Sequence, residues 1–174
     1  MIQTRSTIRY ARIPAWPRWP LLAALTILLG GPVVAPLFQA THMWLVADSG
    51  ALARALLATY VCPTPAKSYM LLGYPMAVCA RCWGATIGLW LAWAAMQRWT
   101  VDGGWWTPLR LFVHAAWPVR LALAALPFLL WPAEIVFWPA APLQTLLLDG
   151  ALAGASAGLF FCSIWPGLVM ERRA

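Results

Sequence analysis

The sequence predicts an all-α fold, an integral membrane bundle of four spanning helices that forms a single domain of 174 residues. Hydrophobic residues make up 63% of the chain and charged residues only 10%, a composition that a soluble domain of this size cannot place on its surface. A hydrocarbon core of about 30 Å needs about 20 apolar residues per helix, so this length allows about four spans. The chain also has 13 tryptophans, a residue that favours membrane–water interfaces and contact with membrane lipids.

The apolar runs place the four spans at residues 19–38, 75–97, 119–138 and 143–169. Residues 39–74 form an outer loop that contains a short interfacial helix, because this stretch is apolar but carries isolated charges. Pro32 and Pro36 should bend the second half of the first span. Pro75 suits the first turn of the second span.

The remaining connections follow from turn residues. The stretch from Arg98 to Arg110 contains a Gly-Gly pair and flanking charges, which predicts a loop. The turn "PAAP" joins the third and fourth spans into a hairpin. The arginine-rich N-terminus is expected to remain attached, because the run after it lacks the small-residue site of a cleaved signal peptide.

The distribution of basic residues predicts the orientation. Nine of the 12 Lys and Arg residues fall on the side of the two termini, and three, Arg54, Lys67 and Arg81, fall on the other. The positive-inside rule then places both termini in the cytoplasm of a bacterial inner membrane. The basic residues are scattered and form no stripe, so no nucleic-acid partner is expected.

Two rows of glycines predict close helix packing. Gly84 and Gly88 lie four residues apart in the second span, and Gly150, Gly154 and Gly158 repeat that spacing in the fourth. Such rows let helix backbones approach closely. The two spans are therefore expected to pack on each other or on a helix of another membrane subunit.

Three charged residues fall at similar depth in the outward half of the bundle. These are Arg81 in the second span, Glu134 near the end of the third and Asp149 near the start of the fourth. An ionised side chain in the bilayer costs about 2.5 kcal/mol or more unless it is paired or hydrated. Pairing of Arg81 with Glu134 or Asp149 is expected, either as a structural ion pair or as part of a proton path or polar ligand pocket.

Cys62, Cys79 and Cys82 form the most distinctive cluster. Cys79 and Cys82 share a helix face at the start of the second span, beside Arg81, and Cys62 precedes them by a flexible loop. This pattern fits a structural disulfide from Cys62 to one of the pair. It also fits a metal site, zinc for example, with His42 as fourth ligand, a redox-active C-x-x-C pair, or cysteines that only pack as apolar side chains.

The other candidate ligands are single residues. Cys162 lies within the fourth span and is expected to be an apolar filler. His42 and His114 are expected to be structural, although either could ligate haem or chlorophyll axially. The sequence has no C-x-x-C-H, P-loop, H-E-x-x-H or G-x-S-x-G motif.

The stretch from Cys62 to Gly88 resembles an uncharacterised family of small bacterial predicted membrane proteins, a domain of unknown function with the signature CHQ-x-PERS…G…VCARCTGIY-x-G. The matching positions are Cys62, Pro65, Ser68, Gly73, Val78, Cys79, Ala80, Arg81, Cys82, Gly84 and Gly88. The resemblance implies a small helical membrane protein and supplies no activity.

The chain departs from this signature at the His and Gln after the first cysteine. Pro63 and Thr64 stand there, with one residue fewer, and Trp83 replaces the Thr after the C-x-x-C pair. If the signature marks a Cys and His metal site, this chain lacks that histidine, and either His42 substitutes or the site is structural.

The sequence favours a non-enzymatic accessory or stabilising subunit of a larger bacterial membrane complex, respiratory or photosynthetic, because little of the chain lies outside the spans. One alternative is an extracytoplasmic thiol-disulfide oxidoreductase that uses Cys79 and Cys82, with Cys62 as the resolving thiol. The other is a metal-binding or transport protein.

Overall fold

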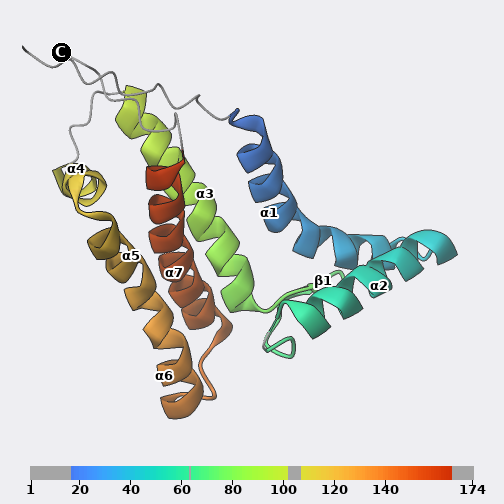
Figure 1. Cartoon of the computed structure of the whole chain (residues 1–174). Helices are drawn as coiled ribbons and strands as arrows, with labels where there is room; N and C mark the ends of the chain where they lie inside the picture. Colours follow the sequence, from blue (N-terminus) through green and yellow to red (C-terminus); the bar gives the residue numbers. More distant parts are fainter. Residues whose placement is uncertain (1–16, 63, 102–106, 166–174) are drawn as a thin grey trace, which may run out of the picture.

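The computed structural model describes residues 17–62, 64–101 and 107–165. This part of the chain is mostly helical, which agrees with the all-α prediction, and adds one small β-hairpin. Figure 1 shows helices α3, α5, α6 and α7 side by side in a bundle, with α1 beside α3 and α2 projecting away from it.

Helix α1 (Trp19–Ala40) begins with a proline in its first turn and contains Pro32 and Pro36. Pro36 has no N–H to donate, so the carbonyl of Pro32 is released from the helix. The backbone N–H of Ala77 donates to that carbonyl at 3.2 Å. The predicted bend is visible in Figure 1, where the second part of α1 leaves the direction of the first. The freed carbonyl therefore anchors the segment that leads into α3.

Helix α2 (Trp44–Tyr60) follows a tight turn and packs back along the second part of α1. The turn contains His42 with φ 56°. A Cβ at Gly50 would lie 2.6 Å from the carbonyl oxygen of Ala35, so only glycine permits this approach. We call residues 36–60 the arm. It holds the helix that the sequence places in the outer loop.

The chain then forms a hairpin of two short strands, β1 (Met70–Leu71) and β2 (Tyr74–Pro75), paired antiparallel. Leu72 and Gly73 make the turn with φ values of 53° and 84°. Positive φ at both central residues is the geometry that matches strand twist in two-residue hairpins. The prediction that Pro75 begins the second span is wrong, because Pro75 pairs with Met70 in the hairpin.

Helices α3 (Ala80–Val101) and α7 (Leu143–Ile164) form the most extensive helix contact among the described residues. Added Cβ atoms would lie 2.0 to 2.1 Å from backbone oxygens of the opposite helix at four positions, Gly84, Gly88, Gly150 and Gly154. Gly158 packs on Ala92 of α3. The two glycine rows thus face each other within the chain, and the surface expected for a partner subunit is already occupied.

The third predicted span is one long element in three parts, α5 (Trp117–Ala125), the 3₁₀ segment η1 (Leu126–Leu129) and α6 (Leu130–Phe137). Pro127 lies in η1, where its missing N–H favours the change of helix type. The predicted 98–110 loop is shorter than expected, because α3 extends to Val101 and α4 (Thr107–His114) begins before Arg110. The Gly-Gly pair lies outside the described residues.

Three helices in the described ranges are long and apolar enough to cross a membrane. They are Trp19–Ala40, Trp117–Phe137 and Leu143–Ile164, which correspond to the first, third and fourth predicted spans. The last four residues predicted for the fourth span lie outside the described residues. Helix α3 has the length of a span, 22 residues, but carries Arg81 together with several tryptophans and glycines and is less apolar.

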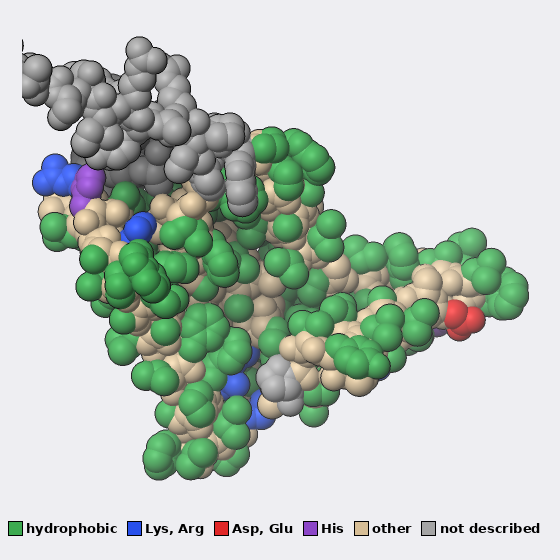
Figure 2. All heavy atoms as spheres, in the orientation of Figure 1, with side chains coloured by type: hydrophobic (Ala, Val, Ile, Leu, Met, Phe, Trp, Pro, Cys, Tyr) green, Lys and Arg blue, Asp and Glu red, His purple; other side chains and the backbone are tan. Residues whose placement is uncertain are grey.

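The surface agrees with an environment of lipid. Figure 2 shows apolar side chains over the bundle and over the arm, with few charged groups between them. Large exposed side chains on the arm include Met43, Trp44, Leu45, Leu52 and Tyr60. Exposure of this extent is unfavourable in water and ordinary against acyl chains.

Candidate functional site

The thiol cluster lies where the loop after α2 meets the start of α3. Cys79 immediately precedes α3, and its carbonyl accepts the first helical hydrogen bond, from Trp83 N–H at 3.0 Å. The Ala80 N–H is satisfied by the carbonyl of Lys67 at 2.8 Å. The helix N-terminus therefore fixes Cys79 and Cys82 in space.

Cys62 reaches the same place from the end of α2. Its own N–H donates to the Leu57 carbonyl at 2.9 Å, which turns the chain back. Its sulfur accepts a hydrogen bond from the Cys79 N–H at 3.1 Å. Cys62 and Cys79 are buried, Cys79 completely, whereas Cys82 is half-buried. Leu57, Val78 and Trp83 surround the three thiols with apolar atoms.

The three sulfur atoms lie within 4.8 Å of one another. The Cys79 thiol approaches the Cys82 sulfur at 3.4 Å, which is far beyond the S–S bond of about 2.05 Å. All four cysteines are free thiols, so the structure does not support the predicted disulfide. A zinc ion held at about 2.3 Å from each sulfur would set the sulfurs about 3.8 Å apart. The cluster is close to that spacing.

The thiol cluster also favours deprotonation of one of its cysteines. Hydrogen bonds from the Cys62 and Cys82 thiols hold the pKa of Cys79 well below the ordinary thiol value. The pKa of Cys62 is raised, chiefly because its thiol donates to Cys79. The α3 N-terminus adds a favourable dipole for an anion at this position. Cys79 is therefore the first of the two to become a thiolate, the form that binds metals.

The predicted fourth ligand does not join these thiols. His42 lies exposed at the turn between α1 and α2, where its ring meets Tyr74 at a centroid distance of 6.3 Å. It is outside the group of cysteines whose ligand atoms converge. His114 is exposed at the end of α4. Cys162 is buried against Met96 and Leu109.

The charged residues form a second cluster on the opposite side of α3. Arg81 is 2% exposed, and its Nη2 donates to Glu134 Oε2 of α6. Its Nε lies 3.3 Å from Asp149 Oδ2 of α7. The guanidinium also stacks over the Trp131 ring, 5.6 Å from the centroid. One arginine thus contacts both acidic residues with which pairing was expected.

Sequence reasoning missed Trp131 and the groove beside the two acids. Trp131 lies three residues before Glu134, so the two share a helix face, and this spacing could have revealed it. Glu134 and Asp149 line a groove of about 470 Å³ between α6 and α7. Its other lining residues are apolar except for Thr145.

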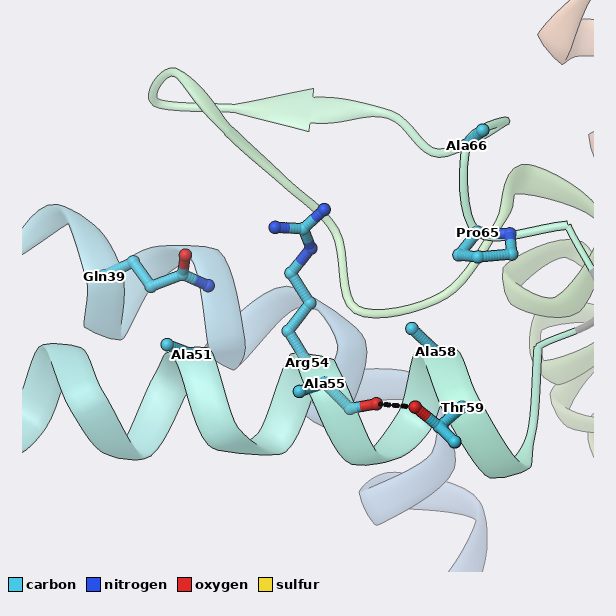
Figure 3. Close-up of a pocket in the computed structure, with 8 residues that line it drawn as sticks. All are labelled: Gln39, Ala51, Arg54, Ala55, Ala58, Thr59, Pro65 and Ala66. Carbon is cyan, nitrogen blue, oxygen red and sulfur yellow. Dashed lines mark hydrogen bonds between the residues drawn. The ribbon is translucent and has the colours of Figure 1, made fainter.

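A further hollow of about 360 Å³ lies between α2 and the loop after it. Figure 3 shows the guanidinium of Arg54 extending from α2 toward the loop that carries Pro65 and Ala66. Thr59 also lines this hollow, and its hydroxyl donates to the Ala55 carbonyl at 2.8 Å. Arg54 has no ion-pair partner among the described acids. It is a half-buried cation without a defined role.

Comparison with known proteins adds a family but no activity. Residues 62–160 match the family described as "Predicted membrane protein (DUF2085)". The match covers more than half of the chain, and it includes the three clustered cysteines and all members of the charged cluster. No curated protein and no solved structure matches the sequence. The chain belongs to the DUF2085 family of predicted membrane proteins.

Proposed function

We propose that this chain is an integral membrane protein that binds one thiophilic metal ion through Cys62, Cys79 and Cys82. The observation that carries the proposal is the convergence of three sulfur atoms within 4.8 Å at the start of α3. Thiolate ligands select zinc and monovalent copper over harder cations. No fourth cysteine, histidine or acidic ligand converges with them among the described residues. An external ligand would therefore complete the tetrahedral coordination of the metal ion.

The surroundings of the sulfurs support a metal rather than ordinary packing. The N–H of Cys79 donates to the Cys62 sulfur at 3.1 Å. Hydrogen bonds to ligand atoms orient them and stabilise their charged form. A lowered thiol pKa at Cys79 also reduces the free energy needed to deprotonate a ligand.

The same proposal places α3 as a fourth span, with both termini cytoplasmic and the thiols on the extracytoplasmic side. Gly84 lies against Leu147 and Gly88 lies against Ala151, so α3 and α7 run in the same direction side by side. A helix of 22 residues that is packed parallel to a candidate span of equal length would cross the same thickness of bilayer. The excess of basic residues on the predicted side of the two termini supports the orientation.

Metal analysis of the purified full chain tests the proposal. We expect about one zinc or copper ion per chain after purification or reconstitution, and loss of that ion in Cys82→Ser. Cys162→Ser is the matched control, because it removes a buried thiol that lies outside the cluster. Absence of stoichiometric metal from the wild-type protein would contradict the proposal. A Cys79–Cys82 disulfide in the protein as isolated would favour the thiol oxidoreductase instead.

A second candidate function is that of an accessory subunit of a larger membrane complex. The arm favours it, because it projects from the bundle and exposes Trp44, Leu45 and Leu52 (Figure 1). An apolar helix of this kind can lie on another membrane protein as well as on lipid. A stable partner that co-purifies after mild detergent extraction would support this role, and a chain that purifies alone would count against it.

A further inference from the structure

We propose that the groove between α6 and α7 binds an amphiphile that carries one primary ammonium group. The ammonium would lie against Glu134 and Asp149, and the alkyl chain would follow the apolar wall of the groove. This inference uses the opposite face of α3 from the thiols, so it does not rest on the metal proposal.

The first support is charge. Two carboxylates, Glu134 and Asp149, share one guanidinium, that of Arg81. With both acids ionised the cluster holds one negative charge in excess, buried between three helices. Lys67 forms no ion pair with either acid, and its ammonium donates to the Pro139 carbonyl. An unpaired charge in a poorly hydrated site is costly, and a bound cation offsets that cost.

The second support is the count of hydrogen bonds. Arg81 donates to one oxygen of Glu134. The other oxygen of Glu134 and the Oδ1 oxygen of Asp149 are buried and have no hydrogen-bond donor among the described residues, and Asp149 Oδ2 has only the ion-pair contact with Arg81 Nε. The two side chains are only 10% and 9% exposed. A primary ammonium has three N–H donors, enough to bond both acceptors that lack a donor.

The third support is the shape and lining of the groove. Its walls are formed largely by apolar side chains, namely Leu130, Ala133, Phe137, Trp138, Leu148 and Leu152. Phe137 is 84% exposed and Leu148 is 70% exposed. These side chains would contact acyl chains in a bilayer, so the groove is continuous with lipid. A ligand that enters from there needs an apolar chain as well as a cationic group.

The position of the two acids along their predicted spans also agrees with an amphiphilic ligand. Asp149 is six residues after the start of α7, or about 9 Å along the helix axis at 1.5 Å per residue. Glu134 is three residues before the end of α6. Both acids therefore lie near the end of their spans, where the ammonium group of an amphiphile sits close to the interface while its chain extends inward.

Titration of the full chain in a neutral maltoside detergent tests the inference. Dodecylammonium is the probe, and thermal unfolding followed by tryptophan fluorescence is the readout. We expect a saturable rise of several degrees in the unfolding temperature, because the ligand binds only the folded state. Dodecyltrimethylammonium has the same charge and chain but no N–H donor, and should give a much smaller rise. Equal effects of the two cations would overturn the hydrogen-bonded site.

Two variants make the test specific. Asp149→Asn removes the excess charge, and we expect the apparent Kd for dodecylammonium to rise about tenfold or more. Asp48→Asn is the control, an aspartate on α2 that lies outside the groove. Leu152→Trp narrows the groove without altering the charges and should also weaken binding. Unchanged binding in both Asp149→Asn and Leu152→Trp would overturn the proposal.

A second experiment distinguishes a membrane lipid from a free long-chain amine as the ligand. The chain is placed in nanodiscs of phosphatidylcholine alone or with added phosphatidylethanolamine. Stabilisation by the primary-amine lipid, lost in Asp149→Asn, identifies a membrane lipid as a ligand. Stabilisation by dodecylammonium but not by this lipid identifies a free long-chain amine. If neither amine stabilises the wild-type protein, the groove is not an ammonium site.

Discussion

Four consecutive residues, Cys79 to Cys82, contribute to two clusters of opposite character. The thiols turn toward the loop after α2, where they meet Cys62. The guanidinium between them in sequence turns toward α6 and α7, where it meets Glu134 and Asp149. The thiol cluster and the ionic cluster therefore lie on different sides of the first turn of α3.

The difference lies in what each cluster holds together. The thiol cluster joins a loop to the start of one helix, and its members pair with one another. The ionic cluster joins three helices, because α3, α6 and α7 each supply one charged residue to it. We infer that damage to the ionic cluster lowers the stability of the fold, whereas damage to the thiol cluster mainly removes a ligand.

The largest expected effect follows removal of the shared cation. Arg81→Met keeps the volume of the side chain but leaves Glu134 and Asp149 buried without a counter-charge. Loss of one partner of a buried ion pair costs about 3–5 kcal/mol. We expect a decrease of that size in the free energy of unfolding, measured by denaturant titration in detergent.

The control for this change is Arg54→Met on α2. Arg54 is half-buried and has no ion pair with a described acid, so its loss should cost less than about 1 kcal/mol. Combining Arg81→Met with Glu134→Gln and Asp149→Asn should recover most of the lost stability, because no buried charge then remains unpaired. Equal losses from Arg81→Met and Arg54→Met would show that the ionic cluster does not hold the helices.

A smaller loss in the free energy of unfolding is expected when the contact between the Arg81 backbone and α7 is disturbed. A Cβ at Gly150 would lie 2.0 Å from the Arg81 carbonyl oxygen, so Gly150→Ala forces the two helices apart beside the ionic cluster. Such overpacking costs about 1–3 kcal/mol. The matched control is Gly30→Ala in α1, where the added methyl meets no atom within 4 Å. It should stabilise its helix by up to about 1 kcal/mol. If Gly150→Ala were more stable than Gly30→Ala, the contact between Gly150 and the Arg81 backbone would not be important for stability.

The two clusters were not equally predictable from the sequence. The ionic cluster follows from one physical cost, because an arginine and two acids in apolar spans at similar depth are driven to pair. The thiol cluster follows from helical spacing and a flexible loop. The position of His42 does not follow from the sequence, because it depends on the direction in which α1 bends, and it lies at a turn beside Tyr74.

The hairpin before α3 shows why the start of that helix was misplaced. Its turn uses Leu72 with φ 53°, whereas two-residue turns of this kind usually begin with Asn, Asp or Gly. Pro75 is compatible with a first helical turn and with a short edge strand. Strand pairing and the bond from Ala77 to the Pro32 carbonyl decide between them. The second of these contacts joins segments that are far apart in the sequence, and local patterns do not encode it.

The smallest effect distinguishes the thiols from one another. Because the pKa of Cys79 is lowered and that of Cys62 is raised, the metal-free protein should hold one thiolate at neutral pH. A second should appear only above the ordinary thiol range. We expect the ultraviolet absorbance of a thiolate at neutral pH, where an ordinary thiol is protonated. This absorbance should persist as the pH is lowered further, because Cys79 stays deprotonated. The signal should vanish in Cys79→Ser and remain in Cys162→Ser, with little change in the free energy of unfolding for either. A wild-type protein without thiolate at pH 7 would place the three sulfurs among ordinary buried thiols, and the functional contrast with the ionic cluster would then be lost.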